Sequence, residues 1–264
     1  MLKITDVYKT FNAGTVNEKV ALNGLNLELK DGDFVTVIGG NGAGKSTMLN
    51  SVAGVYPVDS GKIMLDGVDL THLPEYKRAK FIGRVFQDPM MGTAATMQIE
   101  ENLALAARRG KARTLRSGIT KQERESYKEQ LKILDLGLED RMTSKVGLLS
   151  GGQRQALTLL MATLQKPKLL LLDEHTAALD PKTAAKVLET TQRIVEKDKL
   201  TTLMITHNMR DAIAYGNRLI MMYEGRVVVD VSGEEKKHLT VEQLLNLFSQ
   251  VSGSDEANDK LLLS

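Results

Sequence analysis

A glycine-rich segment constrains the fold of this chain more than any other feature. Residues 39–47 read Gly-Gly-Asn-Gly-Ala-Gly-Lys-Ser-Thr, which fits the pattern G-x-x-x-x-G-K-[ST]. The apolar residues 34–38 before it predict a buried strand, and residues 46–53 after it predict a helix. A strand, a glycine loop and a helix in this order predict a nucleotide-binding α/β core. The alternative, a tight glycine turn with an exposed lysine, is disfavoured by both flanking elements.

The glycine loop carries groups that suit phosphate. Glycine lets the backbone curl so that successive N–H groups and the helix N-terminus point at phosphate oxygens. We expect Lys45 to supply positive charge to the β and γ phosphates, and Ser46 to offer its hydroxyl to Mg²⁺. The candidate phosphate-binding residues are Gly39, Gly40, Asn41, Gly42, Ala43, Gly44, Lys45, Ser46 and Thr47. The loop therefore predicts a mononucleotide site with Mg²⁺.

Two adjacent carboxylates end a second apolar run. Residues 169–172 are all leucine, and Asp173 and Glu174 follow them directly. A phosphate loop is expected to be partnered by an apolar strand that ends in aspartate. We expect Asp173 to hold Mg²⁺ through water, and Glu174 to orient or deprotonate the attacking water. A buried strand that ends in a solvated acidic turn is the alternative, and the presence of the phosphate loop disfavours it.

Strand and helix patterns divide the chain into regions. Residues 88–148 change to long helical patterns, including 99–108 and 121–136. The α/β alternation then resumes with a helix after Gly152, a strand at 168–173, a helix at 181–197 and a strand at 201–206. We predict an α/β fold with a P-loop NTPase core, a mostly parallel sheet, an N-terminal antiparallel β part and an inserted helical subdomain. The predicted core combines 1–87 with 151–235, the helical signature subdomain spans 88–150, and 236–264 form a short helix and a flexible tail.

Composition and charge exclude several classes of protein. The chain has no cysteine, which excludes disulfides and thiolate metal sites. Its 35 basic and 33 acidic residues give a net charge of +2, unlike a dedicated nucleic-acid binder. Residues 1–11 predict a strand rather than a signal peptide. The apolar runs fall far short of the ~20 residues that a membrane-spanning helix needs, so we expect membrane association only through partners.

A third motif distinguishes among the many ATPases and GTPases that share these two features. The sequence Leu-Ser-Gly-Gly-Gln at 149–153 lies at the start of a predicted helix, 20 residues before Asp173. A serine and backbone N–H groups at a helix N-terminus form a second anion cradle. This motif resembles the signature of the ATP-binding-cassette (ABC) family, and the resemblance covers residues 2–230. It implies a head-to-tail dimer in which each ATP is held by the phosphate loop of one copy and, from the other copy, by Ser150, Gly151, Gly152 and Gln153.

Four further residues match positions of that family. Phe11 resembles the aromatic residue that stacks on adenine, although it also fits a buried strand end, and Tyr8 lies nearby as a competitor. Gln87 matches the glutamine that touches Mg²⁺ and the attacking water, and an exposed loop glutamine is the alternative. Asp180 matches the loop that crosses the dimer interface, and it also fits an ordinary helix N-terminal carboxylate. His207 matches the switch histidine at the γ-phosphate, and a structural histidine is the alternative.

His175 departs from the family pattern. Proline usually follows the catalytic glutamate, whereas here His175 follows Glu174 and either alters the turn or adds a titratable group. Because Glu174 and the signature are intact, we expect ATPase activity to survive. The resemblance implies Glu174, His207, Gln87 and Lys45 as catalytic residues, and Ser46, Gln87 and Asp173 as Mg²⁺ ligands.

The resemblance implies the ATP-hydrolysing subunit of an ABC transporter at the cytoplasmic face of the membrane. The expected partners are a second copy, separate transmembrane permease subunits and an extracytoplasmic solute-binding protein, with no nucleic acid. The residues around the motifs look like cassettes of bacterial amino-acid-type uptake systems, which favours an importer of a small solute such as an amino acid. The main alternative is a soluble ABC ATPase that acts on ribosomes or nucleic acid. A P-loop kinase or GTPase would require the signature to be accidental.

Residues 108–128 form a basic segment with eight lysines or arginines and two glutamates. Such a segment either presents a basic face to the inner leaflet or to an acidic partner, or forms a solvated helical surface. We favour the solvated helical surface, with the basic face as the alternative.

Overall fold

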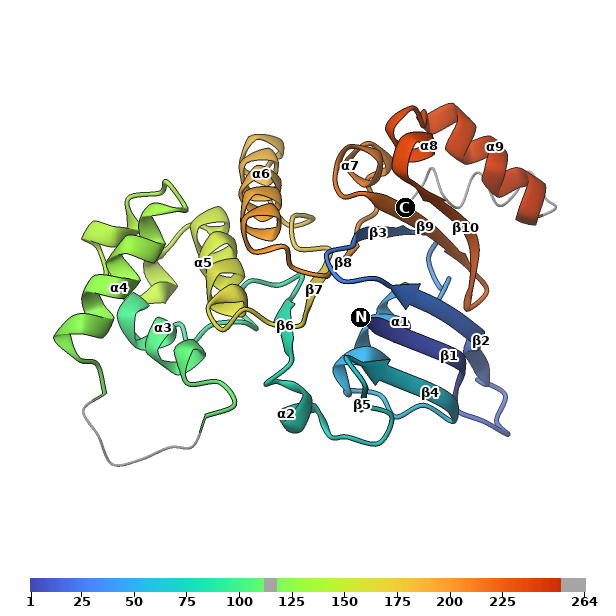
Figure 1. Ribbon diagram of the computed structural model, residues 1–264, viewed down its shortest axis with the longest axis horizontal. Coiled ribbons are helices and arrows are strands. Elements are labelled where there is room, and N and C mark those ends of the chain that lie inside the picture. Colours follow the sequence, from blue (N-terminus) through green and yellow to red (C-terminus); the bar gives the residue numbers. More distant parts are fainter. Residues whose placement is uncertain (112–117, 253–264) are drawn as a thin grey trace. The chain divides into compact units, whose positions relative to one another are not determined.

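The computed structural model describes residues 1–111 and 118–252, and the tail predicted to be flexible lies beyond them (Figure 1). The chain forms two compact units. The first comprises Met1–Arg78 and the described residues from Lys199 onward, and the second comprises Ala79–Asp198. The division predicted at residues 87 and 150 stays a prediction, because the second unit holds 88–150 together with elements on both sides of that segment.

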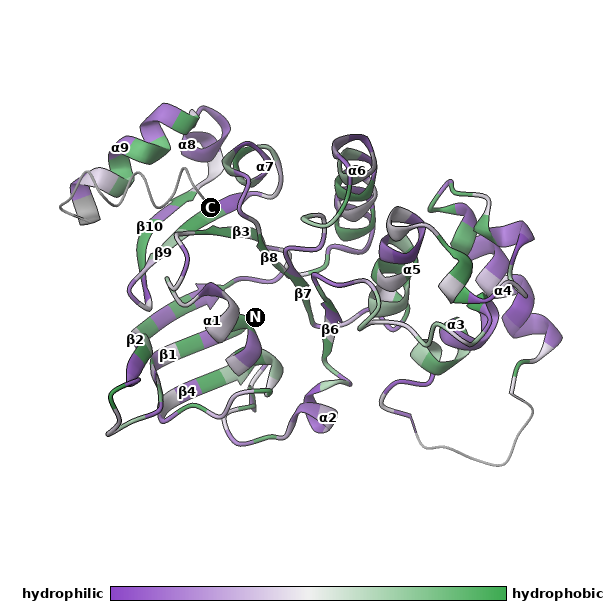
Figure 2. Cartoon of the chain, turned by 180° about the vertical axis from the view of Figure 1, so that it is seen from behind, coloured by the Kyte–Doolittle hydropathy of each residue, from purple (hydrophilic) through white to green (hydrophobic). Residues whose placement is uncertain are grey.

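An antiparallel sheet forms one part of the first unit. Its strands, in the order β2-β1-β4-β5, are β2 (Lys19–Leu29), β1 (Leu2–Phe11), β4 (Ser60–Leu65) and β5 (Val68–Asp69). Hydrophobic and hydrophilic residues alternate along β1, β2 and β4, as expected for a sheet that buries one face (Figure 2). The alternation in β1 shifts at Asp6, whose φ of 48° marks an irregularity of the pairing with β2. Beyond that point Val7 is buried and Phe11 ends the strand.

A mostly parallel group of strands forms the other part of the first unit. The order is β10 (Arg226–Ser232), β9 (Arg218–Tyr223), β3 (Phe34–Ile38) and β8 (Thr202–Ile205). Strand β3 runs parallel to both β8 and β9, and only β10 pairs in the antiparallel sense. All five residues of β3 are buried, which explains why the sequence shows a continuous apolar run there rather than alternation.

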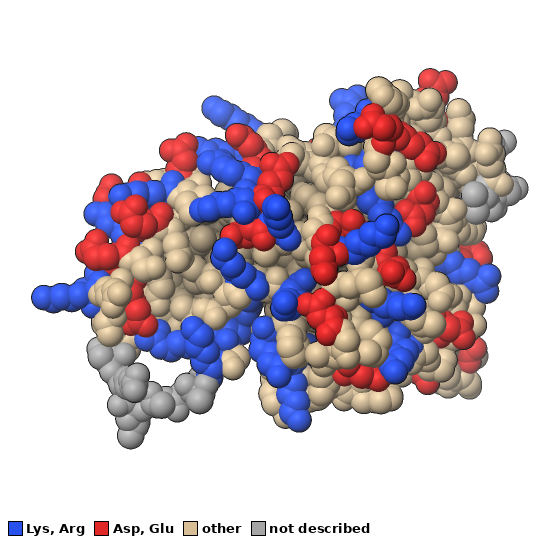
Figure 3. Space-filling model, in the orientation of Figure 1, with Lys and Arg blue, Asp and Glu red and all other residues tan. Residues whose placement is uncertain are grey.

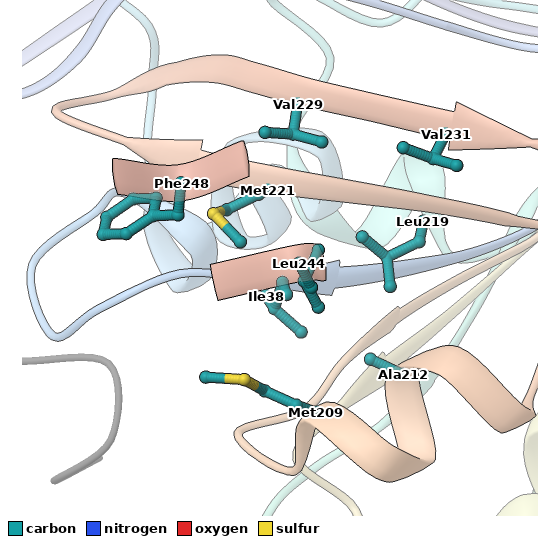
Figure 4. Close-up of a cluster of buried hydrophobic side chains, with 9 residues drawn as sticks. All are labelled: Ile38, Met209, Ala212, Leu219, Met221, Val229, Val231, Leu244 and Phe248. Atoms are coloured by element: carbon teal, nitrogen blue, oxygen red, sulfur yellow. The ribbon is translucent and has the colours of Figure 1, made fainter. Parts of the chain in front are cut away.

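The first unit also contains helices. The helices of the first unit are α1 (Lys45–Ala53), α2 (Glu75–Arg78), α7 (Met209–Ala214), α8 (Gly233–Lys237) and α9 (Val241–Ser252). The side chains of Leu244 and Phe248 on α9 lie with Met221 and Val229 in one buried cluster (Figure 4). The Phe248 ring also meets the Tyr223 ring edge to face at 5.5 Å. This packing anchors the C-terminal helix to β9 and β10.

The second unit combines two parallel strands with four α-helices among its described residues. These elements are β6 (Ile82–Val85), α3 (Ile99–Ala107), α4 (Lys121–Lys132), α5 (Gly151–Thr163), β7 (Leu169–Asp173) and α6 (Pro181–Asp198), with short 3-10 turns η1 (Leu138–Asp140) and η2 (Val146–Leu148). Strand β6 pairs with β7 along its whole length, from Ile82 opposite Leu169 to Val85 opposite Leu172. The four leucines of β7 are fully buried.

The predicted fold class is confirmed, and some predicted boundaries were wrong. The strand at 34–38 and the helix that begins near Pro181 are present. The helix predicted at 121–136 ends at Lys132, because Asp135 and Gly137 adopt left-handed conformations with φ of 53° and 66°. No helix in the described part of the chain is both long enough and apolar enough to cross a membrane.

Candidate functional site

The phosphate loop leaves the end of β3 and turns into α1. Gly42 and Gly44 have φ of 83° and 99°, a conformation that L-amino acids rarely adopt. At Gly44 a Cβ atom would lie 2.5 Å from the carbonyl oxygen of Ala21, so the backbone of β2 passes directly over the loop. The motif therefore has glycine at position 44 for two reasons, the left-handed turn and the close backbone approach.

Lys45 lies inside this loop. Its side chain is 5% exposed, and its Nζ donates to the carbonyl oxygens of Gly39 at 2.6 Å and Gly40 at 3.1 Å. Ser46 is exposed in the first turn of α1, and Thr47 beside it is half-buried. That first turn contains no acidic residue, so its partly positive N-terminus is free of a competing carboxylate within the helix. The arrangement is suited to phosphate, whose oxygens are acceptors like the two carbonyls.

Phe11 is the last residue of β1. Phe11 pairs across the strands with Lys19, and the Nζ of Lys19 lies 3.2 Å from where a Cβ of Gly42 would be. The Phe11 ring contacts the Tyr56 ring edge to face at 5.3 Å. The competitor Tyr8 is instead 37% exposed, with its hydroxyl beside Gly24. The register therefore favours Phe11 as the adenine-stacking residue, a role that stays a prediction.

His207 leaves the same edge of the sheet as the phosphate loop. Strands β3 and β8 are parallel neighbours, with Val37 opposite Ile205, so the residues that follow each strand emerge together. His207 is half-buried between β8 and the first turn of α7. The Asn208 side chain caps α7 by accepting from the N–H groups of Arg210 and Asp211, and Asn208 donates its own N–H to Thr206 Oγ1. These bonds fix the backbone on the C-terminal side of His207.

The second unit holds the adjacent carboxylates. Asp173 is the last residue of β7, and Glu174 has a φ of 44° that turns the chain sharply after the strand. An Arg84 guanidinium nitrogen lies 3.4 Å from an Asp173 carboxylate oxygen, and both side chains are mostly buried. The guanidinium also lies 4.5 Å from the Phe86 ring centroid. Arg84 on β6 is thus a built-in counter-ion of Asp173.

Gln87 emerges at the same edge as those carboxylates. It follows the end of β6, which runs parallel to β7, and its side chain is exposed. The preceding carbonyl, that of Phe86, accepts a hydrogen bond of 3.1 Å from the fully buried Gln155 side chain on α5. The structure therefore groups Gln87, Asp173 and Glu174 within the second unit.

The signature residues cap helix α5. Ser150 is the N-cap, its hydroxyl oxygen accepts from the Gln153 N–H at 3.3 Å, and the Gln153 side chain accepts from the Ser150 N–H at 3.1 Å. The Ser150 hydroxyl hydrogen remains available to an anion in front of the helix. Gly152 is buried, and a Cβ there would lie 2.1 Å from Thr183 Cγ2 on α6. Gly152 thus permits close packing of α5 against α6.

Asp180 caps the neighbouring helix α6. Its carboxylate accepts from the Thr183 N–H at 3.1 Å, and hydrogen bonds from Thr183 lower the pKa of Asp180. The helix-capping interpretation of Asp180 is confirmed by this contact. Its role at a dimer interface stays a prediction.

The donor atoms of the predicted metal ligands fit Mg²⁺. Ser46, Gln87 and Asp173 supply hydroxyl, amide and carboxylate oxygens, the ligand type that Mg²⁺ prefers. Within residues 1–111 and 118–252, no three His, Asp or Glu side chains gather as a metal cage. Mg²⁺ commonly binds through one or two carboxylates together with substrate phosphates, so this sparse set suits a metal that arrives with a nucleotide.

Two site residues were missed by sequence reasoning. Lys19 of β2 lies opposite Phe11 and close to Gly42, and Arg84 of β6 reaches Asp173 on the neighbouring strand β7. No spacing in the sequence signals them, because strand register decides which side chains meet.

Ion pairs neutralise part of the basic segment 108–128 where the structure describes it. Arg108 pairs with Glu123 at 3.0 Å, Arg124 with Glu100 at 2.7 Å and Lys128 with Asp140 at 3.6 Å. Figure 3 shows positive and negative side chains interspersed over one face of the molecule. These pairs favour the solvated helical surface, although Arg113 and Arg116 lie outside the described residues.

Comparisons with known proteins agree with this arrangement. A sequence model of the family described as ABC transporter matches residues 22–177. The chain is 46% identical over 248 residues to the tyrosine transport ATP-binding protein of Clostridioides difficile (strain R20291), which covers 94% of this chain and 98% of that relative. It is 32% identical over 240 residues to the phosphonates import ATP-binding protein PhnC of Lactobacillus acidophilus (strain ATCC 700396 / NCK56 / N2 / NCFM), which covers 89% of this chain and 90% of that relative. Among solved structures, the dimeric post-hydrolysis state of the ATP-binding cassette MJ0796 bound to ADP and Pi matches with a TM-score of 0.75 and 31% identity, over 88% of this chain and 98% of that one.

Proposed function

This chain belongs to the ABC transporter family as the ATP-binding and ATP-hydrolysing subunit that energises a transporter, and on that premise we propose that the transported solute is an amino acid of the tyrosine type. The observation that carries this proposal is the 46% identity to a tyrosine transport ATP-binding protein along nearly the full length of both chains. The cassette itself does not contact the solute. The sequence identity therefore supports membership in a similar transporter, and not a solute-binding site on this chain. The transporter is an importer, as the named functions of several relatives indicate.

ATP binding in the first unit follows from the contacts of the phosphate loop. The β and γ phosphates take the place of the carbonyl oxygens that now accept from Lys45 Nζ, and the N-terminus of α1 adds its partial positive charge. Phe11 stacks on the adenine, and His207 contacts the γ-phosphate from the end of β8.

Hydrolysis uses the carboxylates of the second unit. Glu174 accepts a proton from the attacking water, which Gln87 helps to orient, and Asp173 would hold Mg²⁺. When bound, Mg²⁺ neutralises charge that develops on the phosphates. Arg84 holds the Asp173 side chain in place through their ion pair.

Each ATP site is completed by a second copy of the chain, so that a dimer holds two complete sites. Ser150 with Gly151 and Gly152 at the N-terminus of α5 completes the charge neutralisation of the ATP held by the opposite phosphate loop, and Asp180 lies at the contact between copies. The dimeric solved relative bound to ADP and Pi supports this arrangement. Permease subunits in the membrane and an extracytoplasmic solute-binding protein complete the system, with the cassettes at the cytoplasmic face.

Hydrolysis is tested first on the purified chain. We expect Glu174→Gln to keep ATP binding and to lower the rate by on the order of 10²–10⁴-fold, because the amide has nearly the same shape but cannot take a proton. Glu189→Gln, at an exposed glutamate on α6, is the matched control and should retain wild-type turnover. Steady-state hydrolysis by Glu174→Gln within threefold of wild type would remove Glu174 from this role.

The composite site is tested with a crosslinked heterodimer of Lys45→Ala and Ser150→Arg subunits. In a head-to-tail dimer, one site loses both groups and the other keeps Lys45 and Ser150 intact. The heterodimer should therefore bind one ATP tightly, whereas homodimers of either variant should not. A heterodimer that binds no better than the homodimers would refute the composite site.

The solute is tested by uptake in the native cell. Deletion of the gene should reduce uptake of labelled tyrosine, with uptake restored by the wild-type chain and not by Glu174→Gln. Unchanged tyrosine uptake, with loss of uptake of another solute, would refute the proposed cargo and leave the ATPase role standing.

A further inference from the structure

His175 lies at a position that the proposed mechanism does not use. It follows Glu174 directly, and its side chain is 2% exposed. Its Nε2 lies 3.1 Å from the hydroxyl oxygen of Thr191, which is itself fully buried on α6. His175 and Thr191 thus form a buried polar pair directly beside a proposed catalytic residue.

The direction of this hydrogen bond follows from the partners of Thr191. The Thr191 hydroxyl donates its only hydrogen to the carbonyl oxygen of Val187, one turn earlier on α6, at 2.9 Å. Its oxygen can therefore only accept from His175, so His175 carries a proton on Nε2 and donates it to Thr191. The result is a directed chain from His175 through Thr191 to the backbone of α6.

The backbone around Glu174 depends on fixed neighbours. Glu174 has a φ of 44°, a left-handed conformation that costs a non-glycine residue free energy. On its N-terminal side Asp173 is held in β7, and within the turn the Ala177 N–H donates to the Glu174 carbonyl oxygen at 3.0 Å. The His175 side chain adds a contact from this turn across to α6. A proline at this position would restrict its own φ but would have no side-chain donor to reach that helix.

We infer that His175 is a positioning residue, whose hydrogen bond to Thr191 fixes the turn that aims the Glu174 carboxylate by anchoring it to α6. The inference rests on the proposed role of Glu174. The anchor also connects Glu174 to the helix that begins directly after Asp180, so the orientation of the carboxylate depends on the position of α6. A change in that position alters hydrolysis without altering the phosphate loop.

The test compares two threonines of α6 in the purified full-length chain. Thr191→Val removes the acceptor with little change of shape, and we expect kcat to fall about three- to tenfold, the loss expected from one buried hydrogen bond, with KM for ATP within twofold. Thr190→Val is the matched control, because Thr190 is equally buried and donates to the Lys186 carbonyl in the same way, at 2.8 Å, but does not contact His175. We expect Thr190→Val to keep kcat within twofold of wild type.

Variants of His175 test whether a replacement donor keeps kcat and whether His175 and Thr191 act through the same hydrogen bond. His175→Gln places an amide nitrogen near the position of Nε2 and should retain more than half of the wild-type kcat, whereas His175→Phe keeps a ring without a donor and should match Thr191→Val. In the double variant with Thr191→Val, His175→Phe should add no further loss, because the two residues act through one hydrogen bond. Additive losses in the double variant would overturn the inference.

Failure of this inference can be told apart from failure of the proposed function. If Glu174→Gln is inactive while Thr191→Val and His175→Phe keep the wild-type kcat, Glu174 keeps its role and the positioning role of His175 is refuted. If Glu174→Gln hydrolyses ATP at nearly the wild-type rate, the proposed function fails first. Thermal unfolding and ATP affinity are measured for every variant, and a loss of kcat that is matched by an equal loss of ATP affinity also overturns the positioning role. If His175→Phe does not fold, the pair of threonine variants decides.

Discussion

The substitution Gly44→Ala measures how tightly the phosphate loop is enclosed by its own fold. Gly44 has a φ of 99°, and the left-handed conformation costs an L-amino acid about 1–2 kcal/mol. The added Cβ would also lie 2.5 Å from the Ala21 carbonyl oxygen and 3.2 Å from the Gly225 Cα. Both are backbone atoms that no rotamer change can move, and forced overpacking of this kind costs about 1–3 kcal/mol. We therefore expect Gly44→Ala to lower the free energy of unfolding by about 2–5 kcal/mol.

Gly14→Ala is the control for the conformational part of that cost. Gly14 has a φ of 75°, but no atom lies within 4 Å of the position of its Cβ, so only the left-handed penalty of about 1–2 kcal/mol applies. Urea unfolding, followed by circular dichroism, gives the free energy of unfolding of both variants. The dependence of this free energy on urea concentration should be equal in the two if their unfolded states are alike. Gly44→Ala should also lose ATP affinity, whereas Gly14→Ala should keep it. Equal destabilisation by the two substitutions, or wild-type ATP affinity in Gly44→Ala, would refute the argument that backbone approach shapes the loop.

Three further outcomes follow from the geometry. Ser150→Ala should lower the free energy of unfolding by about 1 kcal/mol, because the helix cap is lost. In the Glu174→Gln chain it should also abolish ATP-dependent dimerisation, measured by light scattering. Leu171→Ala should lower the urea-derived free energy of unfolding by about 2–5 kcal/mol, because the side chain is fully buried in β7; a smaller loss would mean that the site collapses around the cavity. Burial lowers the pKa of His175 from its ordinary 6.5 to about 4, so the unfolded chain binds the imidazole proton more tightly than the folded chain does. The free energy of unfolding should therefore fall by up to about 3 kcal/mol as the pH drops from 6.5 to 4, measured by urea denaturation at each pH. In His175→Gln the free energy of unfolding should change little over this pH range. A pH dependence equal to that of the wild type would contradict the assignment of the effect to His175.

Much of the candidate site was predictable because its motifs are continuous in sequence. The phosphate loop, the carboxylates after β7 and the capped start of α5 each depend on residues within a few positions of one another. Local backbone chemistry decides such features: glycine permits the turns, an apolar run forms a buried strand, and serine caps a helix. The α/β fold followed from the same elements, since their alternation allows few arrangements.

Boundaries and alternatives that depend on single backbone angles were harder to predict. The helix predicted to reach residue 136 stops at Lys132, where the left-handed Asp135 cannot continue it. The choice between Phe11 and Tyr8 also had no local signal, since both lie on one strand. The irregular pairing after Asp6 sets the register in which Phe11, and not Tyr8, lies opposite Lys19.

The sequence by itself thus determined the local elements of the candidate site: the glycine loop before α1, the carboxylates that follow the buried strand and the serine-capped start of α5. Only the tertiary structure decided which side chains support those groups. Arg84 meets Asp173 from a strand 89 residues away in sequence, and His175 meets Thr191 across 16 residues. Strand register and helix packing set these contacts, and both are outcomes of burying apolar surface throughout the unit rather than of any local pattern.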